Sequence, residues 1–282
     1  MKKVQVVTDS TAYIPQQQLA KYNIEVVPLN VIWDNQTYRD GVDITPQNFY
    51  QRLQKSKTLP STSQPSAAAF KSIFKKNLEE DREIIAILIS SEISGTVNSA
   101  LQAKQELGEN QIQIVDSRTA AMAAGLQVLT VARAAAAGAS LAECHAQALK
   151  AQHHTDVIFV VDTLEFLHRG GRIGGAKRLF GSMLNIKPIL EMREGKIEPL
   201  DQVRTQSKAI ERMLAIMKER IGEERPVQIA GFHSNAPLLA ENLLEKACDQ
   251  FEIRDSYLTE LSPVIGTHVG PGTVALAALH GM

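Results

Sequence analysis

Residues 84–96 read IIAILISSEISGT, an apolar run that gives way to small hydroxyl residues and a glycine. The apolar part, Ile84–Ile89, has no polar alternation, which predicts a strand covered on both faces, as in a parallel sheet. The polar residues that follow predict a loop, and Thr96–Leu107 has the pattern of a helix. The stretch therefore predicts one strand–loop–helix unit of an α/β protein.

The same unit recurs through the first half of the chain. Short β-branched runs alternate with helical patterns, with strands expected at 4–7, 24–33 and 112–115 and helices at 13–22, 47–56, 66–78 and 120–137. Repeated strand–helix units of this length favour a mostly parallel, Rossmann-like sheet with right-handed crossovers. We expect this N-terminal α/β domain to span residues 1–155.

The second half has a different character. Val157–Val161 is another apolar run, but the segment 186–197 alternates with polar residues and contains Glu194-Gly195, a hairpin turn signal. Further strands are expected at 227–233 and 253–261, with helices at 207–221 and 236–251. We expect residues 156–282 to form a C-terminal α/β domain with a mixed sheet.

Composition and charge narrow the classes of function. The 282 residues carry a net charge of −1, which supplies no basic excess for binding nucleic acid. The apolar run at the N-terminus ends at Thr8-Asp9, and no apolar run approaches the ~18 residues of a membrane span. Cys144 and Cys248 lie far apart in the chain, which fits a reduced compartment. We therefore expect a cytoplasmic protein without a membrane span.

The loop before Thr96 is a candidate anion site. Free N–H groups and the positive end of the helix dipole point at such a loop, and Gly95 would let a ligand oxygen approach the backbone. The loop contains neither lysine nor arginine, so it suits a carboxylate better than a polyphosphate. The alternative interpretation is that Ser94 simply caps the helix.

Other polar stretches are also candidates. Three expected strands end in Asp9-Ser10, Asp116-Ser117 and Asp162-Thr163, which would gather at one edge of a parallel sheet, although Asp before a helix is also an ordinary cap. Residues 59–65 form a hydroxyl cluster between two prolines, with an ordinary loop as the alternative. Residues 167–178 combine glycines with cations, either as a solvated helix start or as an arm facing an anion. His268 lies in a glycine-rich stretch, 266–273, ahead of an apolar segment expected to be helical.

Motifs for catalysis or metal binding are scarce. The sequence contains no G-x-S-x-G, no H-E-x-x-H and no C-x-x-C. The adjacent residues His153 and His154 would diverge on a helix and could not share a metal ion. We expect no catalytic residue, no metal and no cofactor.

Taken together, these segments resemble the DegV family of bacterial fatty-acid-binding proteins over about residues 3–280. The resemblance rests on seven segments in order: 7–11 (VTDST), 61–65 (STSQP), 94–96 (SGT), 115–117 (VDS), 169–173 (RGGRI), 185–189 (NIKPI) and 270–272 (GPG). It implies two α/β domains that bury a long-chain fatty acid such as palmitate in a tunnel between them, with a role in lipid transport or fatty acid metabolism. By the family's pattern Thr62, Ser94 and Gly95 would hold the carboxylate, and His268 would support them.

The resemblance also implies a possible partner, an ATP-dependent fatty acid kinase to which the bound acid is presented. Arg169, Arg172 and Arg204 would then be candidates for contact with the partner or with a phosphoryl group. Burying ~14 methylenes gives about 10 kcal/mol gross, and a charge-assisted hydrogen bond to the head about 1.5–3 kcal/mol. Association costs of ~4–15 kcal/mol consume much of that sum, so the tail should supply most of the affinity.

Two other classes of function stay open at this point. A stand-alone enzyme would be a hydrolase using Ser94 or a phosphotransferase using the Arg169–Arg172 arm, but nucleophile–base spacing is missing. A DNA-binding regulator would need a basic face, and a net charge of −1 argues against one.

Overall fold

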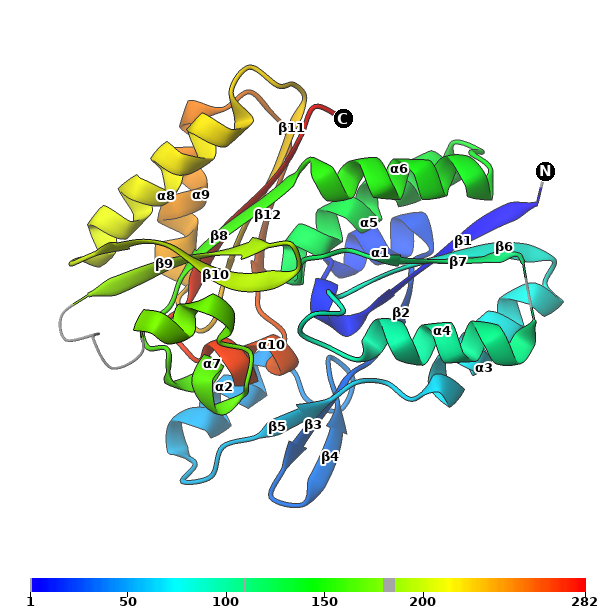
Figure 1. Ribbon diagram of the computed structural model, residues 1–282, viewed down its shortest axis with the longest axis horizontal. Helices are drawn as coiled ribbons and strands as arrows, with labels where there is room; N and C mark the ends of the chain where they lie inside the picture. Colours follow the sequence, from blue (N-terminus) through cyan, green and yellow to red (C-terminus); the bar gives the residue numbers. More distant parts are fainter. Residues whose placement is uncertain (1, 109, 180–185) are drawn as a thin grey trace.

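The computed structural model describes residues 2–108, 110–179 and 186–282, and contains the two sheets expected from the sequence (Figure 1). The first sheet is parallel with the order β2-β1-β6-β7. Its strands are β2 (Glu25–Val27), β1 (Lys3–Asp9), β6 (Arg82–Leu88) and β7 (Ile112–Asp116). It follows the expected Rossmann-like pattern because each crossover is long enough to hold a helix.

Both faces of this sheet are covered by helices, which explains the unbroken apolar run of β6. Ile84, Ala86 and Leu88 pack with α3 (Ala67–Glu79) and α4 (Thr96–Leu107) on one face. Ile85 and Ile87 point the other way, toward α5 (Ala121–Ala136). Successive side chains of a strand alternate between faces, so a strand covered on both sides needs apolar residues at every position.

The second sheet is mixed, also as expected, with the order β10-β9-β8-β13-β11-β12. Its strands are β8 (Thr155–Val160), β9 (Lys187–Arg193), β10 (Lys196–Val203), β11 (Val227–His233), β12 (Ile253–Glu260) and β13 (Val274–His280). Strands β9 and β10 form the hairpin expected at Glu194-Gly195, and both turn residues have positive φ, 49° and 83°. Helices α8 (Gln206–Ile221) and α9 (Pro237–Gln250) cover the outer face of this sheet.

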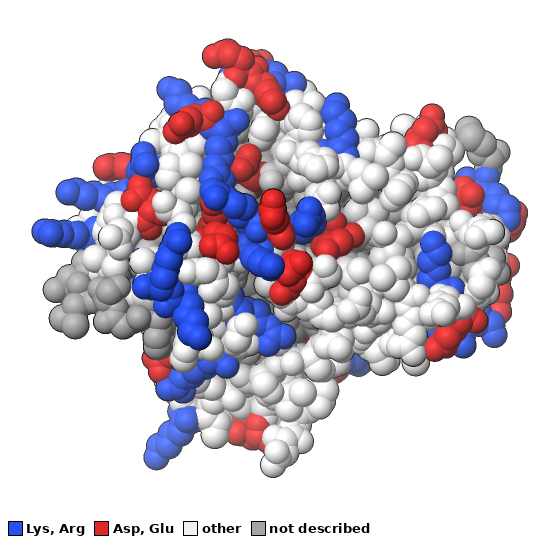
Figure 2. All heavy atoms as spheres, in the orientation of Figure 1, with Lys and Arg blue, Asp and Glu red and all other residues white. Residues whose placement is uncertain are grey.

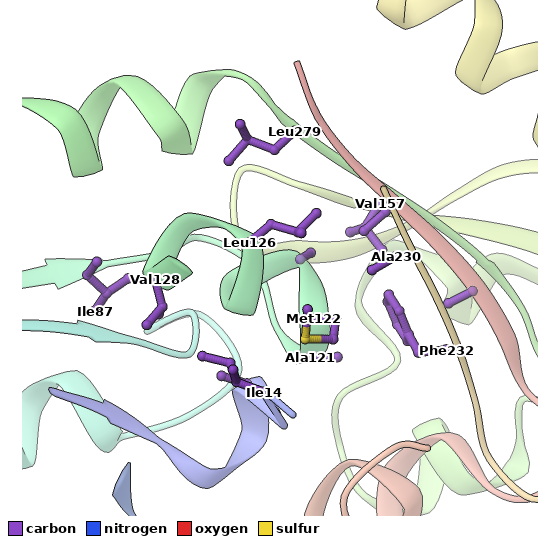
Figure 3. Close-up of a cluster of buried hydrophobic side chains, with 14 of the residues drawn as sticks. Ile14, Ile87, Ala121, Met122, Leu126, Val128, Val157, Ala230, Phe232 and Leu279 are labelled. Carbon is purple, nitrogen blue, oxygen red and sulfur yellow. The ribbon is translucent and has the colours of Figure 1, made fainter. Parts of the chain in front are cut away.

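The inner face of the mixed sheet packs against α5, which therefore lies between the two sheets. Figure 3 places Leu126 of α5 between Ile87 of β6 and Val157 of β8. Helices α1 (Gln16–Tyr22) and α6 (Leu141–His153) flank α5, and all belong to one hydrophobic cluster that crosses position 155. The two halves of the chain thus share a core through α5.

A small third sheet lies below the other two in Figure 1 and was not expected from the sequence. It has the order β4-β3-β5, with β3 (Asn30–Trp33), β4 (Gln36–Arg39) and β5 (Ser61–Ser63). It packs on α2 (Pro46–Lys55) and α10 (Pro263–Val269) through a cluster that contains Trp33, Phe49 and Val264. Short helices α7 (Glu165–Arg169), η1 (Ser10–Ala12) and η2 (Gly174–Leu179) complete the fold.

Five local expectations were wrong. Residues 274–280 form β13, not a helix, and His268 lies within α10 instead of a glycine-rich turn. The segment 24–33 is two strands, β2 and β3, in different sheets, and 61–63 is the edge strand β5 instead of a loop. Asp162 follows β8, which belongs to the mixed sheet and runs antiparallel to both neighbours, so it does not share an edge with Asp9 and Asp116.

In the part of the chain that is described, no helix combines the length and the apolar character needed to cross a lipid bilayer.

Candidate functional site

A cavity opens where the parallel sheet, the mixed sheet and the small third sheet meet. It comprises about 840 Å³ of space free of atoms, including its opening to solvent. Both halves of the chain contribute to its wall. The apolar part of the wall consists of Leu29, Ile89, Ile93, Ala120, Ala121, Val157, Phe159, Leu167, Met192, Ile197, Phe232, Leu261, Val264, Ile265, Val269 and Ala275. Such a wall suits a hydrocarbon group, because burying apolar surface is its main source of favourable free energy.

Polar side chains on the wall come from four separate segments of the chain. Thr62 lies in β5, His268 in α10, Ser94 in the loop between β6 and α4, and Arg172 between α7 and η2. Gln64, which follows β5, is exposed and also belongs to the wall, so this group extends to the opening. We refer to Thr62, Gln64, Ser94, Arg172 and His268 as the polar cluster.

Thr62 and His268 are joined directly, with Thr62 Oγ1 2.8 Å from His268 Nε2 although the residues are 206 positions apart. Among the described residues, His268 Nδ1 has no hydrogen-bond partner. A buried N–H without a partner is costlier and rarer than a buried acceptor without one. We therefore assign the proton to Nε2, which donates to Thr62 and leaves the Thr62 hydroxyl proton free for a ligand.

His268 is held in its neutral form. Burial and the positive charge of Arg172 lower the pKa of His268 to about 4. The ring also lies against Gly170, where a Cβ would be 2.2 Å from Nδ1, so only glycine leaves room for it. At neutral pH the ring can thus donate one hydrogen bond, to Thr62, without adding a charge.

Arg172 connects this pair to the loop after β6. Its Nε donates to the backbone oxygen of Ile93 at 3.1 Å, and its NH1 donates to the oxygen of Gly170 at 2.6 Å. Two hydrogen bonds to backbone fix the guanidinium on the cavity wall. The arginine brings a positive charge to a site whose hydroxyl groups are neutral.

The loop itself contributes Ser94. Its Oγ lies 2.8 Å from Thr96 Oγ1 and 3.4 Å from the Thr96 backbone nitrogen, at the start of α4. The N-cap residue of α4 is Gly95, which has no side chain to cap the helix. The first turn of α4 therefore keeps backbone N–H groups that no N-cap side chain satisfies, as expected. Gly95 is not part of the cavity wall. A Cβ there would lie 2.9 Å from Gln64 Nε2, so the glycine makes room for Gln64.

The remaining sequence candidates lie elsewhere. Arg169 is exposed and pairs with Glu165 at 2.5 Å, and Arg204 is exposed after β10. Asp9 accepts hydrogen bonds from the Thr11 and Ile89 backbone nitrogens, which is the capping role given as its alternative. The segment 185–189 is described only from Ile186, since Asn185 lies outside the described residues.

Sequence reasoning missed two features of the site. Gln64 is predicted only as a member of the 61–65 motif, and Arg172 is predicted to contact a partner or a phosphoryl group, whereas the structure places both on the cavity wall. An arginine on the cavity wall next to Gly170-Gly171 could have been suspected from the glycines. No local signal indicates that β5 and α10 meet.

A parallel and a mixed sheet on either side of one helix, with a mainly apolar cavity between them, define an α/β protein built on two large sheets with an internal cavity. Residues 3–280 match the family described as "Uncharacterised protein, DegV family". The chain belongs to the DegV family.

Relatives of similar length support this assignment. A DegV domain-containing protein from Clostridium perfringens is 38% identical over 278 residues, covering 97% of this chain and 98% of the relative. One from Streptomyces coelicolor is 38% identical over 277 residues and covers 98% of each chain.

Solved structures of the family have the same fold. A DegV family protein from Thermus thermophilus, described as binding a fatty acid, is 33% identical and superposes with a TM-score of 0.94 over 99% of each chain. DegV from Bacillus subtilis, described as a fatty acid binding protein, is 30% identical with a TM-score of 0.90, over 99% of this chain and 100% of that one.

Proposed function

We propose that this protein binds one long-chain fatty acid such as palmitate, with its carboxylate at the polar cluster and its tail along the apolar wall. The observation that carries the proposal is the Thr62–His268 pair beside Arg172 at a cavity otherwise lined by hydrocarbon. The solved relatives described as fatty acid binding proteins support it. We also propose that the boundary between two domains lies near residue 155, with the acid held between them.

The polar cluster can satisfy a carboxylate without a metal ion. Thr62 and Ser94 offer hydroxyl groups, and the Arg172 guanidinium compensates part of the negative charge. Each charge-assisted hydrogen bond contributes about 1.5–3 kcal/mol, whereas a tail of ~14 methylenes contributes on the order of 10 kcal/mol before the costs of association. The head therefore determines orientation, and the tail determines most of the affinity.

We further propose that the protein serves lipid transport or fatty acid metabolism by presenting its ligand to an ATP-dependent fatty acid kinase. Arg169 and Arg204 are exposed and could contact such a partner. On the face seen in Figure 2, lysine and arginine are interspersed with acidic side chains over β9 and β10. A surface of mixed charge suits a protein partner better than nucleic acid, which needs a continuous basic face.

A stand-alone hydrolase using Ser94 receives no support from the geometry. Among the described residues, Ser94 Oγ forms its hydrogen bonds with Thr96, and His268 is engaged with Thr62. A serine nucleophile needs a base within hydrogen-bond reach. We propose a binding protein, not an enzyme acting alone.

The test is to identify and then measure the ligand. Lipid extracted from the purified protein should contain a C16–C18 acid in near-stoichiometric amount by mass spectrometry. After delipidation, the protein should bind palmitate with a stoichiometry of one in calorimetry. Folded protein that yields no acid and binds none after delipidation would contradict the proposal.

A further inference from the structure

Apart from the polar cluster, a group of side chains suited to binding a metal ion lies outside the cavity wall. His154 follows α6 as its C-terminal cap, Glu224 lies in the loop after α8, and His280 ends β13. One ligating atom of each residue lies within 4.8 Å of those of the other two. In Figure 1 the C-terminal end of the chain passes beside the end of α6, which brings these distant segments together.

The distances are close to those of a tetrahedral metal site. His154 Nδ1 is 3.3 Å and His280 Nδ1 is 2.7 Å from Glu224 Oε2. Ligands bonded to zinc at about 2.1 Å are ~3.4 Å apart in a tetrahedron. The His154–Glu224 separation already fits, and the His280–Glu224 contact needs to open by less than ~1 Å.

The ring of His280 is oriented by a carboxylate on the side away from Glu224. Its Nε2 lies 3.2 Å from Asp156 Oδ2, and Asp156 Oδ1 accepts a hydrogen bond from Arg220 NH1 at 2.9 Å. A histidine whose Nε2–H donates to a fixed carboxylate directs Nδ1 to the opposite side, where a metal ion would replace the proton that Nδ1 shares with Glu224 Oε2. This carboxylate–histidine arrangement commonly supports a metal ligand, and it is independent of the three ligands themselves.

The backbone of Gly281 passes close to Glu224 and His154, and the missing side chain makes this approach possible. Gly281 has φ +71°, and a Cβ there would lie 2.6 Å from Glu224 Oε2 and 3.2 Å from His154 Nδ1. The His280 backbone nitrogen donates to the His154 oxygen at 3.1 Å, so the two histidines are held together by the main chain. The ligands are thus positioned by elements that are already connected.

We propose that His154, Glu224 and His280 bind a divalent transition-metal ion, and that Zn²⁺ fits this set of ligands. Two imidazole nitrogens and one carboxylate suit zinc, and they discriminate against Mg²⁺ and Ca²⁺, which prefer oxygen. Water completes the coordination, since His154 and Glu224 are 30% and 49% exposed. The ion joins the end of α6 to the last strand and to the α8–β11 loop, and therefore links the two halves of the chain.

The experiment uses the full chain without an affinity tag, because added histidines would bind the same ions. Chelator-treated protein is titrated with ZnCl₂ against a chromophoric chelator, and with CoCl₂ while the visible absorption of tetrahedral Co²⁺ is recorded. The wild type should bind one ion. His154→Ala and Glu224→Gln should each weaken binding tenfold or more, and Asp156→Asn by ~10- to 100-fold.

His153→Ala is the matched control, because His153 is the exposed neighbour of His154. It should bind Zn²⁺ as the wild type does, and all variants should bind palmitate equally, which separates this site from the cavity. Wild-type protein that takes up no Zn²⁺ at micromolar concentration and gives no Co²⁺ absorption would overturn the proposal. Equal Zn²⁺ affinity in His154→Ala, Glu224→Gln and the wild type, or equal loss in His153→Ala, would overturn it as well.

Discussion

Replacing Thr62 by valine tests the proposed binding of the carboxylate most directly. Valine has nearly the shape of threonine but lacks its hydroxyl group, so the volume of the cavity is preserved. In the wild type, Thr62 Oγ1 accepts from His268 Nε2 at 2.8 Å and can donate its proton to the ligand. The variant loses that donor and leaves the buried Nε2–H of His268 without its acceptor.

The expected change in affinity follows from this single contact. A hydrogen bond to a charged group contributes about 1.5–3 kcal/mol, which corresponds to a ~10- to 150-fold weaker affinity for palmitate. A neutral head gains only about 0.5–1.5 kcal/mol from the same hydroxyl group. The loss for hexadecanol should therefore be smaller than the loss for palmitate. The unpaired Nε2–H should also lower the free energy of unfolding by ~1–3 kcal/mol.

Dissociation constants can be measured on delipidated protein by displacement of a fluorescent fatty acid, with palmitate and hexadecanol as competitors. Thr62→Ser keeps the hydroxyl group and should stay close to the wild type. Ser61→Ala removes an exposed hydroxyl group from the same strand and should have no effect. If Thr62→Val binds palmitate within twofold of the wild type, or loses as much affinity for the alcohol as for the acid, Thr62 does not bind the carboxylate.

Three further changes test the cavity wall, His268 and the buried carboxyl of Asp40, which lies outside the cavity wall. Ala275→Leu adds carbon atoms to the wall and should weaken binding of a C18 acid more than of a C12 acid in the same displacement assay, since the longer tail needs the lost space. The pKa of His268 is lowered from 6.5 to about 4, so the folded state binds the His268 proton less tightly than the unfolded state does. The neutral ring's contribution to the free energy of unfolding is therefore present above pH 6.5 and is lost as pH falls toward 4. In the wild type, the free energy of unfolding should fall by about 2–3 kcal/mol between pH 6.5 and pH 4 because of this group. His268→Gln should lack that fall, and urea denaturation of the variant and the wild type across this pH range measures the difference. Burial raises the pKa of Asp40 from 3.8 to about 7, so the contribution of Asp40 to the free energy of unfolding is fully present below pH 3.8 and is lost as pH rises through 7. Asp40→Asn should therefore flatten the dependence of the unfolding free energy on pH between 3.8 and 7. An unchanged pH dependence would contradict the burial of an ionisable Asp40.

Local sequence patterns predicted much of the fold correctly. The unbroken run Ile84–Ile89 predicted a strand covered on both faces, and β6 has α3 and α4 on one side and α5 on the other. Glu194-Gly195 predicted the β9–β10 hairpin because few residue pairs accept positive φ at both turn positions. These features depend on residues close together in the chain, so the local sequence pattern is enough to predict them.

The errors came from segments whose surroundings decide their structure. Residues 274–279 are apolar throughout, a pattern that fits a buried strand and a buried helix equally well. They form β13 because β8 and β11 on either side satisfy its backbone groups. Asp162 likewise follows an apolar strand as Asp9 does, but the direction and sheet of β8 are set by its partners.

The sequence by itself determined most of the strands and helices of the two large sheets and the polar segments around Thr62, Ser94 and His268, because burial patterns, turns and caps are encoded within a few residues. Only the tertiary structure decided that β5 meets α10, that Arg172 lies on the cavity wall, and that His154 and His280 face the same glutamate. Such contacts join residues up to 206 positions apart, and they form because the two sheets bury their faces on one helix. The free energy of that packing belongs to the whole core, and no short segment encodes it.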